Sequence, residues 1–482
     1  MASLQSGDPR QGQEDTGLRN RDLLTIDDLT IGEIEAVFSL ADEMASDVRA
    51  YSDLCRGFVM ASLFYEPSTR TRLSFETAMH RLGGNVVTAA DISTTSLAKG
   101  ESLADTARVV GSYVDVIVVR HPWEGSARAI ANYAGVPVIN AGDGSHEHPT
   151  QTLCDLYTLR KEKGRIEELS VALCGDLKGA RTVHSLTYAL ARFGANIFFI
   201  PTKGYELPDY VKRKLGREFI GSVSEVDQPA SDAQAATDLG ELDAIYQTPA
   251  EPHQLALLAD AKMKIGRVAY DVLYASRLQK ERHGSQKDQD ENSYVRVDRK
   301  LMKRPQFKEA IVMHPLPRVD EIAYELDEDP RSIYFKQAAY GVPIRMALLA
   351  LLLGAVRPDI QERPDRYSRP VDYPVYKSGK GTRCSNPTCV SNQEAGYIDP
   401  EFWIISQQPT VFSCVYCQQE VRAKFAGSGR TRVFHGAELY SARRVKEDNL
   451  VYFESSEQAA EKGFRPGWRV KPDSMSCHRG AQ

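Results

Sequence analysis

The chain has 482 residues, a formal net charge of −5 and 42% hydrophobic residues. This composition is typical of a soluble globular protein with several domains, and it gives no electrostatic basis for binding nucleic acid. The first twenty residues contain no apolar segment of the kind that directs secretion, so we expect a disordered tail over residues 1–20 and a cytoplasmic protein. The longest apolar run, Met346–Val356, is far shorter than the roughly 18 residues that span a bilayer, which indicates a core helix.

The first strong signal along the chain is a segment suited to binding an anion. Residues 58–63 form an apolar, strand-like run, and apolar residues then recur with helical spacing from Phe75 to Leu82. Between them stands Ser68-Thr69-Arg70-Thr71-Arg72. Backbone N–H groups at a helix start, with hydroxyls and a guanidinium, form a cradle for phosphate. Taken alone, the segment is explained equally well by a capped, solvated helix start that carries two ordinary arginines.

Short apolar strands then alternate with helical patterns as far as residue 356. This alternation predicts an α/β fold with two doubly wound domains, each built on a parallel sheet. The strands are expected at residues 116–119, 137–140, 171–174, 196–200 and 310–313.

Polar loops follow four of these strands directly. Ligands of open α/β sheets bind beyond the carboxyl ends of the strands, so the four loops are candidates for one shared site. Each loop alone has an ordinary explanation, because a histidine beside a proline is more often a loop residue than a catalyst. The loops are Arg120-His121, residues 142–151, residues 175–181 and residues 314–318.

The chain changes character after residue 356. Residues 357–382 are rich in proline, arginine, tyrosine and aspartate, and we interpret them as a linker. Four cysteines then form two closely spaced pairs about two dozen residues apart, which predicts a structural zinc site with no open position for catalysis. Its ligands are Cys384, Cys389, Cys414 and Cys417, in a module over residues 383–425. Residues 426–482 are a C-terminal tail of unknown role.

Six motifs together resemble aspartate carbamoyltransferase, over roughly residues 20–356. The resemblance implies a carbamoyl-phosphate domain (21–155), an aspartate domain (156–330), a helix returning to the first domain (331–356), and a homotrimer or larger assembly with shared active sites. It also implies a role in pyrimidine biosynthesis. The cysteine region resembles the zinc domain of the regulatory chain that partners some of these enzymes. The motifs are residues 68–72, 96–102, 148–151, 181–184, 277–282 and 314–318.

The resemblance also implies the role of each site residue. Carbamoyl phosphate would be held by Ser68, Thr69, Arg70, Thr71, Arg120, His148, Gln151, Leu316 and Pro317, with a cis bond between the last two. L-aspartate would be bound by Lys99, reaching in from a neighbouring chain, and by Arg181, Arg277 and Gln279. Catalysis would fall to Arg70, Thr71, Lys99, Arg120 and His148, and no organic cofactor is expected.

Two departures from the family pattern leave questions open. The Lys99 loop is shorter than forms with two adjacent lysines, so Thr95 or Ser96 could supply the hydroxyl expected there. Residues 243–248 and 271–276 are alike, and the stretch at about 226–270 is interpreted as an insertion.

Three questions of function follow from the sequence. Ornithine carbamoyltransferase is the first alternative, although its cationic substrate does not call for Arg277. An inactive, zinc-bearing assembly homologue is the second. We also expect no response to CTP or ATP, because the sequence shows no second domain that could bind a nucleotide.

Overall fold

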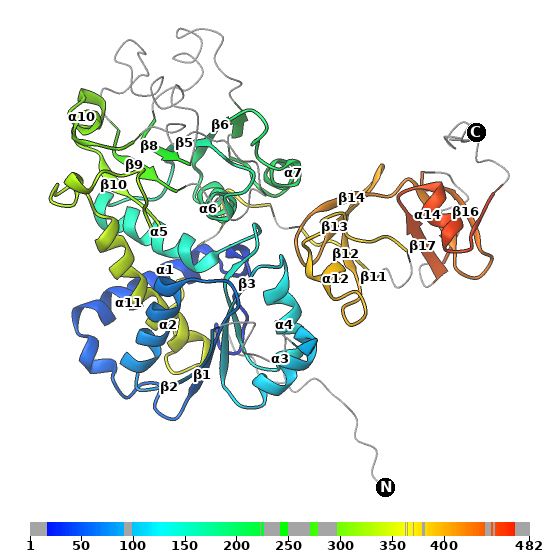
Figure 1. Cartoon of the computed structure of the whole chain (residues 1–482), viewed down its shortest axis with the longest axis horizontal. Helices are drawn as coiled ribbons and strands as arrows, with labels where there is room; N and C mark the ends of the chain where they lie inside the picture. The colour runs from blue at the N-terminus through cyan, green and yellow to red at the C-terminus, as the bar shows by residue number, and fades with distance from the viewer. Residues whose placement is uncertain are drawn as a thin grey trace.

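A computed structural model was obtained for the whole chain (Figure 1). The structure describes residues 17–90, 99–221, 223–225, 242–248, 270–277, 296–361, 363, 365–369, 371–377, 381–438, 445–446 and 449–467. Two parallel sheets covered by helices form the larger part, as the sequence predicted. Within the described part of the chain, no helix combines the length and apolar character needed to cross a membrane.

The first domain has a four-stranded parallel sheet in the order β2-β1-β3-β4. Strand β1 is central and pairs with both β2 and β3, so that Met60 lies beside Val86 and Val116. Its strands are β1 (Val59–Phe64), β2 (Asn85–Ala89), β3 (Val116–His121) and β4 (Val138–Asp143). Its helices are η1 (Ile26–Asp28), α1 (Ile31–Ser46), η2 (Val48–Tyr51), α2 (Thr69–Arg81), α3 (Leu103–Gly111), α4 (Ser126–Ala134) and α5 (Pro149–Lys163).

The second domain has a six-stranded parallel sheet in the order β10-β9-β8-β5-β6-β7. Its strands are β5 (Ser170–Gly175), β6 (Asn196–Pro201), β7 (Val223–Glu225), β8 (Ala244–Gln247), β9 (Val272–Ala275) and β10 (Ile311–Met313). Its helices are α6 (Arg181–Arg192), α7 (Asp209–Glu218), α10 (Arg299–Met302), η5 (Pro305–Phe307) and η6 (Tyr324–Leu326).

The position of strand β8 differs from the expectation that residues at about 226–270 form an insertion. It lies inside the sheet, between β5 and β9, with Tyr246 beside Leu173 and Tyr274. The likeness of residues 243–248 to 271–276 therefore reflects two adjacent buried strands, which need the same apolar residues at the same register. Most of the remaining stretch lies outside the described residues.

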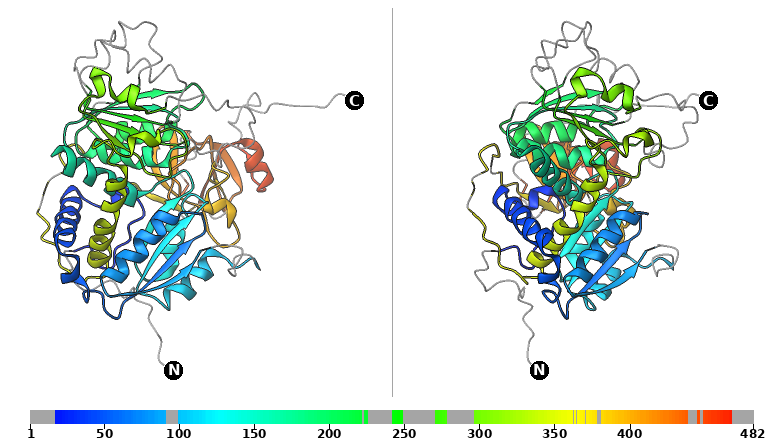
Figure 2. Two further views of the ribbon diagram at one scale, coloured as in Figure 1. Left: turned by 60° about the vertical axis from the view of Figure 1, so that its left-hand side comes forward. Right: turned by 90° about the vertical axis from the view of Figure 1, so that its left-hand side faces the viewer.

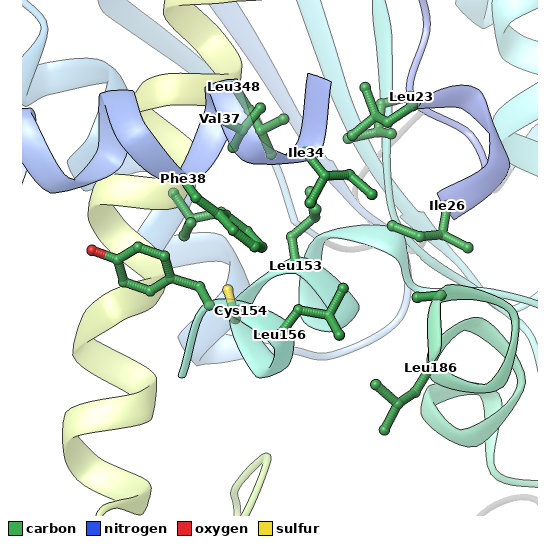
Figure 3. Packing of buried hydrophobic residues seen from close by; sticks show 14 of the residues in the cluster. Leu23, Ile26, Ile34, Val37, Phe38, Leu153, Cys154, Leu156, Leu186 and Leu348 are labelled. Carbon is green, nitrogen blue, oxygen red and sulfur yellow. The ribbon is translucent and has the colours of Figure 1, made fainter. Parts of the chain in front are cut away.

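The long helix α11 (Tyr334–Leu352) leaves the second domain and packs against α1, α2 and α5 of the first. Figure 3 shows Leu348 close to Val37 and Phe38 of α1, with Leu153 and Leu156 of α5 across the same core. Each such side chain contributes roughly 1.5–3 kcal/mol when it is fully buried. The first domain thus depends on chain segments more than 300 residues apart, since α1 begins at Ile31 and α11 at Tyr334.

Two small β modules follow. We call residues 375–422 the cysteine module; it comprises β11 (Val375–Lys377), α12 (Val390–Gln393), β12 (Glu401–Gln407), β13 (Thr410–Cys414) and β14 (Glu420–Arg422). Strand β11 lies within the expected linker but pairs with β12, so the module begins earlier than the sequence suggested.

The second, outer module replaces much of the expected C-terminal tail. It comprises β15 (Phe425–Ser428), β16 (Val433–Gly436), β17 (Leu450–Phe453), α14 (Ser456–Glu461) and β18 (Arg465–Pro466) around a small aromatic core. In Figures 1 and 2 the cysteine module lies against both large domains, and the outer module (red) lies beyond it.

Candidate active site

A cavity of about 330 Å³ lies at the carboxyl ends of strands from both large domains. Five guanidinium groups line it, whereas Glu66 is the one acidic side chain among the described lining residues. So strong a positive excess favours ligands that carry two or more negative charges. The five arginines are Arg70, Arg120, Arg181, Arg277 and Arg345.

The start of α2 forms one wall of the cavity. Strand β1 ends at Phe64 and α2 begins at Thr69, and the side chain of its N-cap residue, Ser68, makes no capping hydrogen bond. Helix capping by the Ser68 hydroxyl therefore does not explain the serine at this position. Partial burial and the charge of Arg277 lower the pKa of Arg70, which indicates that these two guanidinium groups lie close together.

Glu66 connects the two domains across the cavity. Arg120, at the end of β3, donates to Glu66 Oε1 at 2.8 Å. Arg181, the first residue of α6, donates to both oxygens of Glu66 at 3.1 Å. The side chain of Arg181 is only 5% exposed and Arg120 only 11%, so the ion pairs are shielded from water. Sequence reasoning missed Glu66, because its partners Arg120 and Arg181 lie 54 and 115 positions away along the chain.

The start of α5 supplies two further predicted residues. His148 is its N-cap, buried at 4% exposure, and its Nδ1 lies 3.4 Å from Thr150 Oγ1. Gln151 donates its Nε2–H to Asp155 at 2.8 Å. Gln151 also lines the cavity, and its amide oxygen can accept a hydrogen bond while its amide nitrogen bonds Asp155.

Asp155 is a second residue that sequence reasoning missed. Besides Gln151, its carboxylate accepts from Gln337 of α11 at 2.8 Å and from Tyr274 of β9 at 3.1 Å. Complete burial, only partly offset by these hydrogen bonds, raises its pKa to about 7. One buried carboxylate thereby joins α5, α11 and the strand that leads to Arg277.

The turn after β10 closes another side of the cavity. The Leu316-Pro317 peptide bond is cis, and Leu316 has a φ of 54°. His314 holds the turn, because its Nδ1 accepts from the Leu316 backbone N–H at 2.7 Å while its Nε2 lies 2.7 Å from Glu321. Burial lowers the pKa of His314, which keeps the ring neutral near neutral pH.

The remaining predicted residues are placed unevenly. Ser68, Thr69, Thr71, Leu316, Pro317 and Arg277 line the cavity, but Lys99 is exposed and is not part of the lining. Gln279, Thr95 and Ser96 lie outside the described residues.

The four cysteines predicted as metal ligands come together in the cysteine module. All are buried, and their sulfur atoms lie within 4.8 Å of one another. Cys384 and Cys417 are 3.4 Å apart at sulfur, and Cys389 and Cys414 are 3.8 Å apart. Tetrahedral zinc with bonds of about 2.3 Å would place sulfurs about 3.8 Å apart, so the group fits.

The comparisons with known proteins agree with this geometry. Residues 21–161 match the model "Aspartate/ornithine carbamoyltransferase, carbamoyl-P binding domain", and residues 250–352 match the "Asp/Orn binding domain" model of that family. An aspartate carbamoyltransferase catalytic subunit from Thermoplasma acidophilum is 45% identical over 341 residues, which are 70% of this chain and 99% of that protein. The chain belongs to the aspartate carbamoyltransferase family.

Further relatives extend the family match. A catalytic subunit from Clostridium botulinum strain Hall is 44% identical over 340 residues, covering 70% of this chain and 99% of that one. The solved M. jannaschii aspartate transcarbamoylase catalytic subunit is 40% identical, with a TM-score of 0.54 over 69% of this chain and 98% of that chain. A Trypanosoma cruzi aspartate transcarbamoylase in complex with carbamoyl aspartate and phosphate is 34% identical, with a TM-score of 0.56 over 70% and 96%.

The cysteine module has its own relationship. Residues 380–425 match "Aspartate carbamoyltransferase regulatory chain, metal binding domain". This aspartate carbamoyltransferase chain therefore carries catalytic-chain domains and a regulatory-chain metal-binding domain in one polypeptide, as the sequence predicted.

Proposed function

We propose that the protein transfers the carbamoyl group of carbamoyl phosphate to L-aspartate, giving N-carbamoyl-L-aspartate and phosphate, in de novo pyrimidine biosynthesis. The observation that carries the proposal is the cavity with five guanidinium groups and one carboxylate. Carbamoyl phosphate brings a phosphate and aspartate brings two carboxylates, and bidentate arginine pairing suits all three groups. A cationic amino acid such as ornithine finds no unpaired acidic partner among the described lining residues.

Carbamoyl phosphate is assigned to the first-domain side. The backbone N–H groups at the start of α2, with Ser68, Thr69 and Thr71, take the phosphate, and Arg70 and Arg120 neutralise its charge. The carbonyl oxygens of Leu316 and Pro317 and the amide oxygen of Gln151 accept from the carbamoyl NH2 group. The neutral His314 and the buried Asp155 hold those acceptors in place.

The chemical step requires no covalent intermediate with the protein. The uncharged amine of aspartate attacks the carbamoyl carbon, negative charge builds on the carbonyl oxygen, and the bond from carbon to the phosphate oxygen then breaks. Arg120, His148 and Thr71 are the donors for that oxygen, which is stabilisation directed at the transition state. This role of His148 requires the proton on Nε2, the tautomer in which Nδ1 accepts from Thr150 Oγ1. The departing phosphate takes the proton of the amine.

Aspartate is assigned to Arg181, Arg277 and Gln279 on the second-domain side, with Lys99 of a neighbouring chain. Lys99 is exposed and does not line the cavity of its own chain, which is what a homotrimer would require if each site is completed by the next subunit. Mixing inactive Lys99→Ala and His148→Ala chains tests this. Partial recovery of activity is expected from shared sites, and no recovery from independent ones.

Zinc is the metal proposed for the cysteine module, where four thiolates fill a tetrahedral site and leave the metal structural. Reduced thiols also accord with a cytoplasmic location. Elemental analysis should find one zinc per chain. Cys414→Ser should lose it, whereas Cys55→Ser, a change at a buried cysteine outside the cluster, should keep it.

The deciding assay supplies carbamoyl phosphate with either L-aspartate or L-ornithine. Carbamoylation of aspartate alone is expected. Equal or faster turnover of ornithine would overturn the assignment in favour of the ornithine enzyme, and no turnover of either would point to an inactive assembly homologue.

A further inference from the structure

The cysteine module is joined to the first domain by hydrogen bonds to the loop between β3 and α4 and to the start of α3. Glu124, between β3 and α4, exchanges two backbone hydrogen bonds with the module, donating to Thr388 at 3.2 Å and accepting from Val390 at 2.9 Å. Glu394 of the module accepts the backbone N–H of Leu103 at 2.8 Å, at the start of α3. The two bonds of Glu124 join backbone to backbone, and the third joins a backbone N–H to the buried side chain of Glu394.

Apolar packing strengthens the same contact. Side chains of the module and of α3 and α4 belong to one continuous buried cluster. Gly125 has a φ of 79°, and a Cβ there would stand 2.5 Å from that of Tyr416, so only glycine allows the close approach. The module and the first domain therefore behave as one body.

The contact with the second domain is of a different kind. Glu420, at the start of β14, has a side chain only 5% exposed and accepts from two arginines of α7: Arg213 Nε at 2.5 Å and Arg217 at 2.8 Å. Arg217 is 27% exposed and Arg213 53%, so the Arg217 pair is the better shielded. Beside them, Lys214 of α7 donates to Gln418 of the module at 3.0 Å.

A cavity of about 460 Å³ lies next to these bonds, with residues of the module and of both large domains in its lining. Its described lining includes Trp403 and Ile405 of the module, Tyr210 and Arg192 of the second domain, and Asp27 of the first domain. The bonds of Glu420 and Gln418 join the module to α7 beside this cavity, and Lys214 of α7 also pairs with Asp27 of the first domain at 2.5 Å. The module is thus packed on one domain and tethered by side chains to the other.

We infer that Glu420 is a positioning residue for the reaction, fixing α7 through Arg213 and Arg217 so that the second domain holds its angle to the first. Helix α7 packs on α6, whose first residue is Arg181. The angle that Glu420 supports is the one at which Arg181 meets Glu66 across the active site. The inference rests on the proposed function only in its kinetic consequence.

The test compares Glu420→Gln and Arg217→Gln with a matched control, Glu401→Gln. Glu401 lies in the same module and pairs with Lys377 at 3.0 Å, without touching α7. The expected result for the first two variants is at least a threefold rise in the KM for aspartate, with unchanged zinc content and unchanged affinity for carbamoyl phosphate. Hydrogen exchange in α7 should also quicken. The control should match the wild type in all four measurements.

Each other outcome is decisive. Unchanged KM for aspartate and unchanged exchange in α7 would overturn the inference. If Glu420→Gln loses its zinc, Arg217→Gln decides alone, because that residue lies in the second domain, away from the cysteines. If the wild type fails to carbamoylate aspartate, the proposed function is wrong, and exchange in α7 still decides the positioning role.

Discussion

The two halves of the active-site cavity are built on different supports. On the first-domain side, the start of α2, the end of β3 and the start of α5 project from a four-stranded sheet whose strands have five or six residues. On the second-domain side, Arg277 follows β9, a strand of four residues, next to β10 with three. The first half is set by the core of one domain, whereas the second depends on where a whole domain is placed.

This difference separates two kinds of functional defect. Damage to the first half should remove stabilisation of the transition state and lower kcat. Damage to the second half, or to whatever fixes the domain angle, should first raise the KM for aspartate. Glu66 and Asp155 join the two halves and should affect both.

The largest expected effect is in the first half, from Arg70→Ala. Losing a guanidinium directed at the developing charge should raise the barrier by about 3 kcal/mol or more, a fall of over a hundredfold in kcat. Arg81→Ala, at the far end of the same helix, is the matched control and should stay near normal. Steady-state rates with both substrates measure it, and a near-normal rate for Arg70→Ala would remove that residue from the mechanism.

The pH dependence of unfolding in the Asp155→Asn variant tests the buried residue that connects the two halves of the site. Burial raises the pKa of Asp155 to about 7, against 3.8 for the ordinary group, so the folded protein binds this proton more tightly than the unfolded chain. The contribution of Asp155 to the free energy of unfolding should therefore fall as pH rises from about 4 to 7.

Asparagine has no carboxyl group to titrate, so the Asp155→Asn variant should lack this decrease in the free energy of unfolding. Relative to wild type, the variant should gain roughly 3 to 4 kcal/mol between pH 4 and 8, because each tenfold change in proton affinity is worth about 1.4 kcal/mol. Urea unfolding at several pH values measures this. A difference between the two proteins that does not vary with pH would contradict a raised pKa.

Arg277→Ala should act on the second half alone. Losing a charge-assisted pair with a substrate carboxylate costs about 2 kcal/mol, which predicts a roughly thirtyfold rise in the KM for aspartate. Carbamoyl phosphate binding should be unaffected, and Arg299→Ala, on α10 of the same domain, should leave both constants alone. Weakened carbamoyl phosphate binding would show that the two halves are not separable.

The smallest effect is expected from Tyr274→Phe. It removes one hydroxyl that donates to Asp155 at 3.1 Å, and it should cost about 1 kcal/mol of folding stability. Tyr324→Phe is the control, because Tyr324 is 66% exposed. Equal unfolding free energies for the two variants would show that the Asp155 bond does not hold the halves together.

Sequence analysis predicted best the features that depend on residues close together in the chain. The strand and helix at residues 58–81 and the cysteine pairs each depend on a few neighbouring residues, and the structure contains them. The cis bond before Pro317 was expected from the family resemblance, and it is present. Contacts between residues far apart in the chain could not be predicted in this way. Glu66 meets Arg181 across 115 positions, and Asp155 meets Gln337 across 182, so neither partnership leaves a local pattern.

The errors of sequence reading have a similar origin. Strand β8 is short and wholly buried, so it shows no alternation that would mark it as a strand within the stretch expected as an insertion. The outer module has a core of a few aromatic residues spread between Phe425 and Phe464. These residues are too few and too far apart to show a periodic pattern from which a fold could be predicted.

The docking of the cysteine module also has a consequence for synthesis on the ribosome. Leu103 meets Glu394 across 291 residues, and at about 5–20 residues per second these partners emerge roughly 15 to 60 seconds apart. The first domain itself waits for α11, which ends at Leu352, before its core can close. During that interval the faces of α1, α2, α3 and α4 that later become interior are open to water. The nascent chain therefore offers chaperones a long-lived apolar surface, and the native core is completed only after residue 394 has been synthesised.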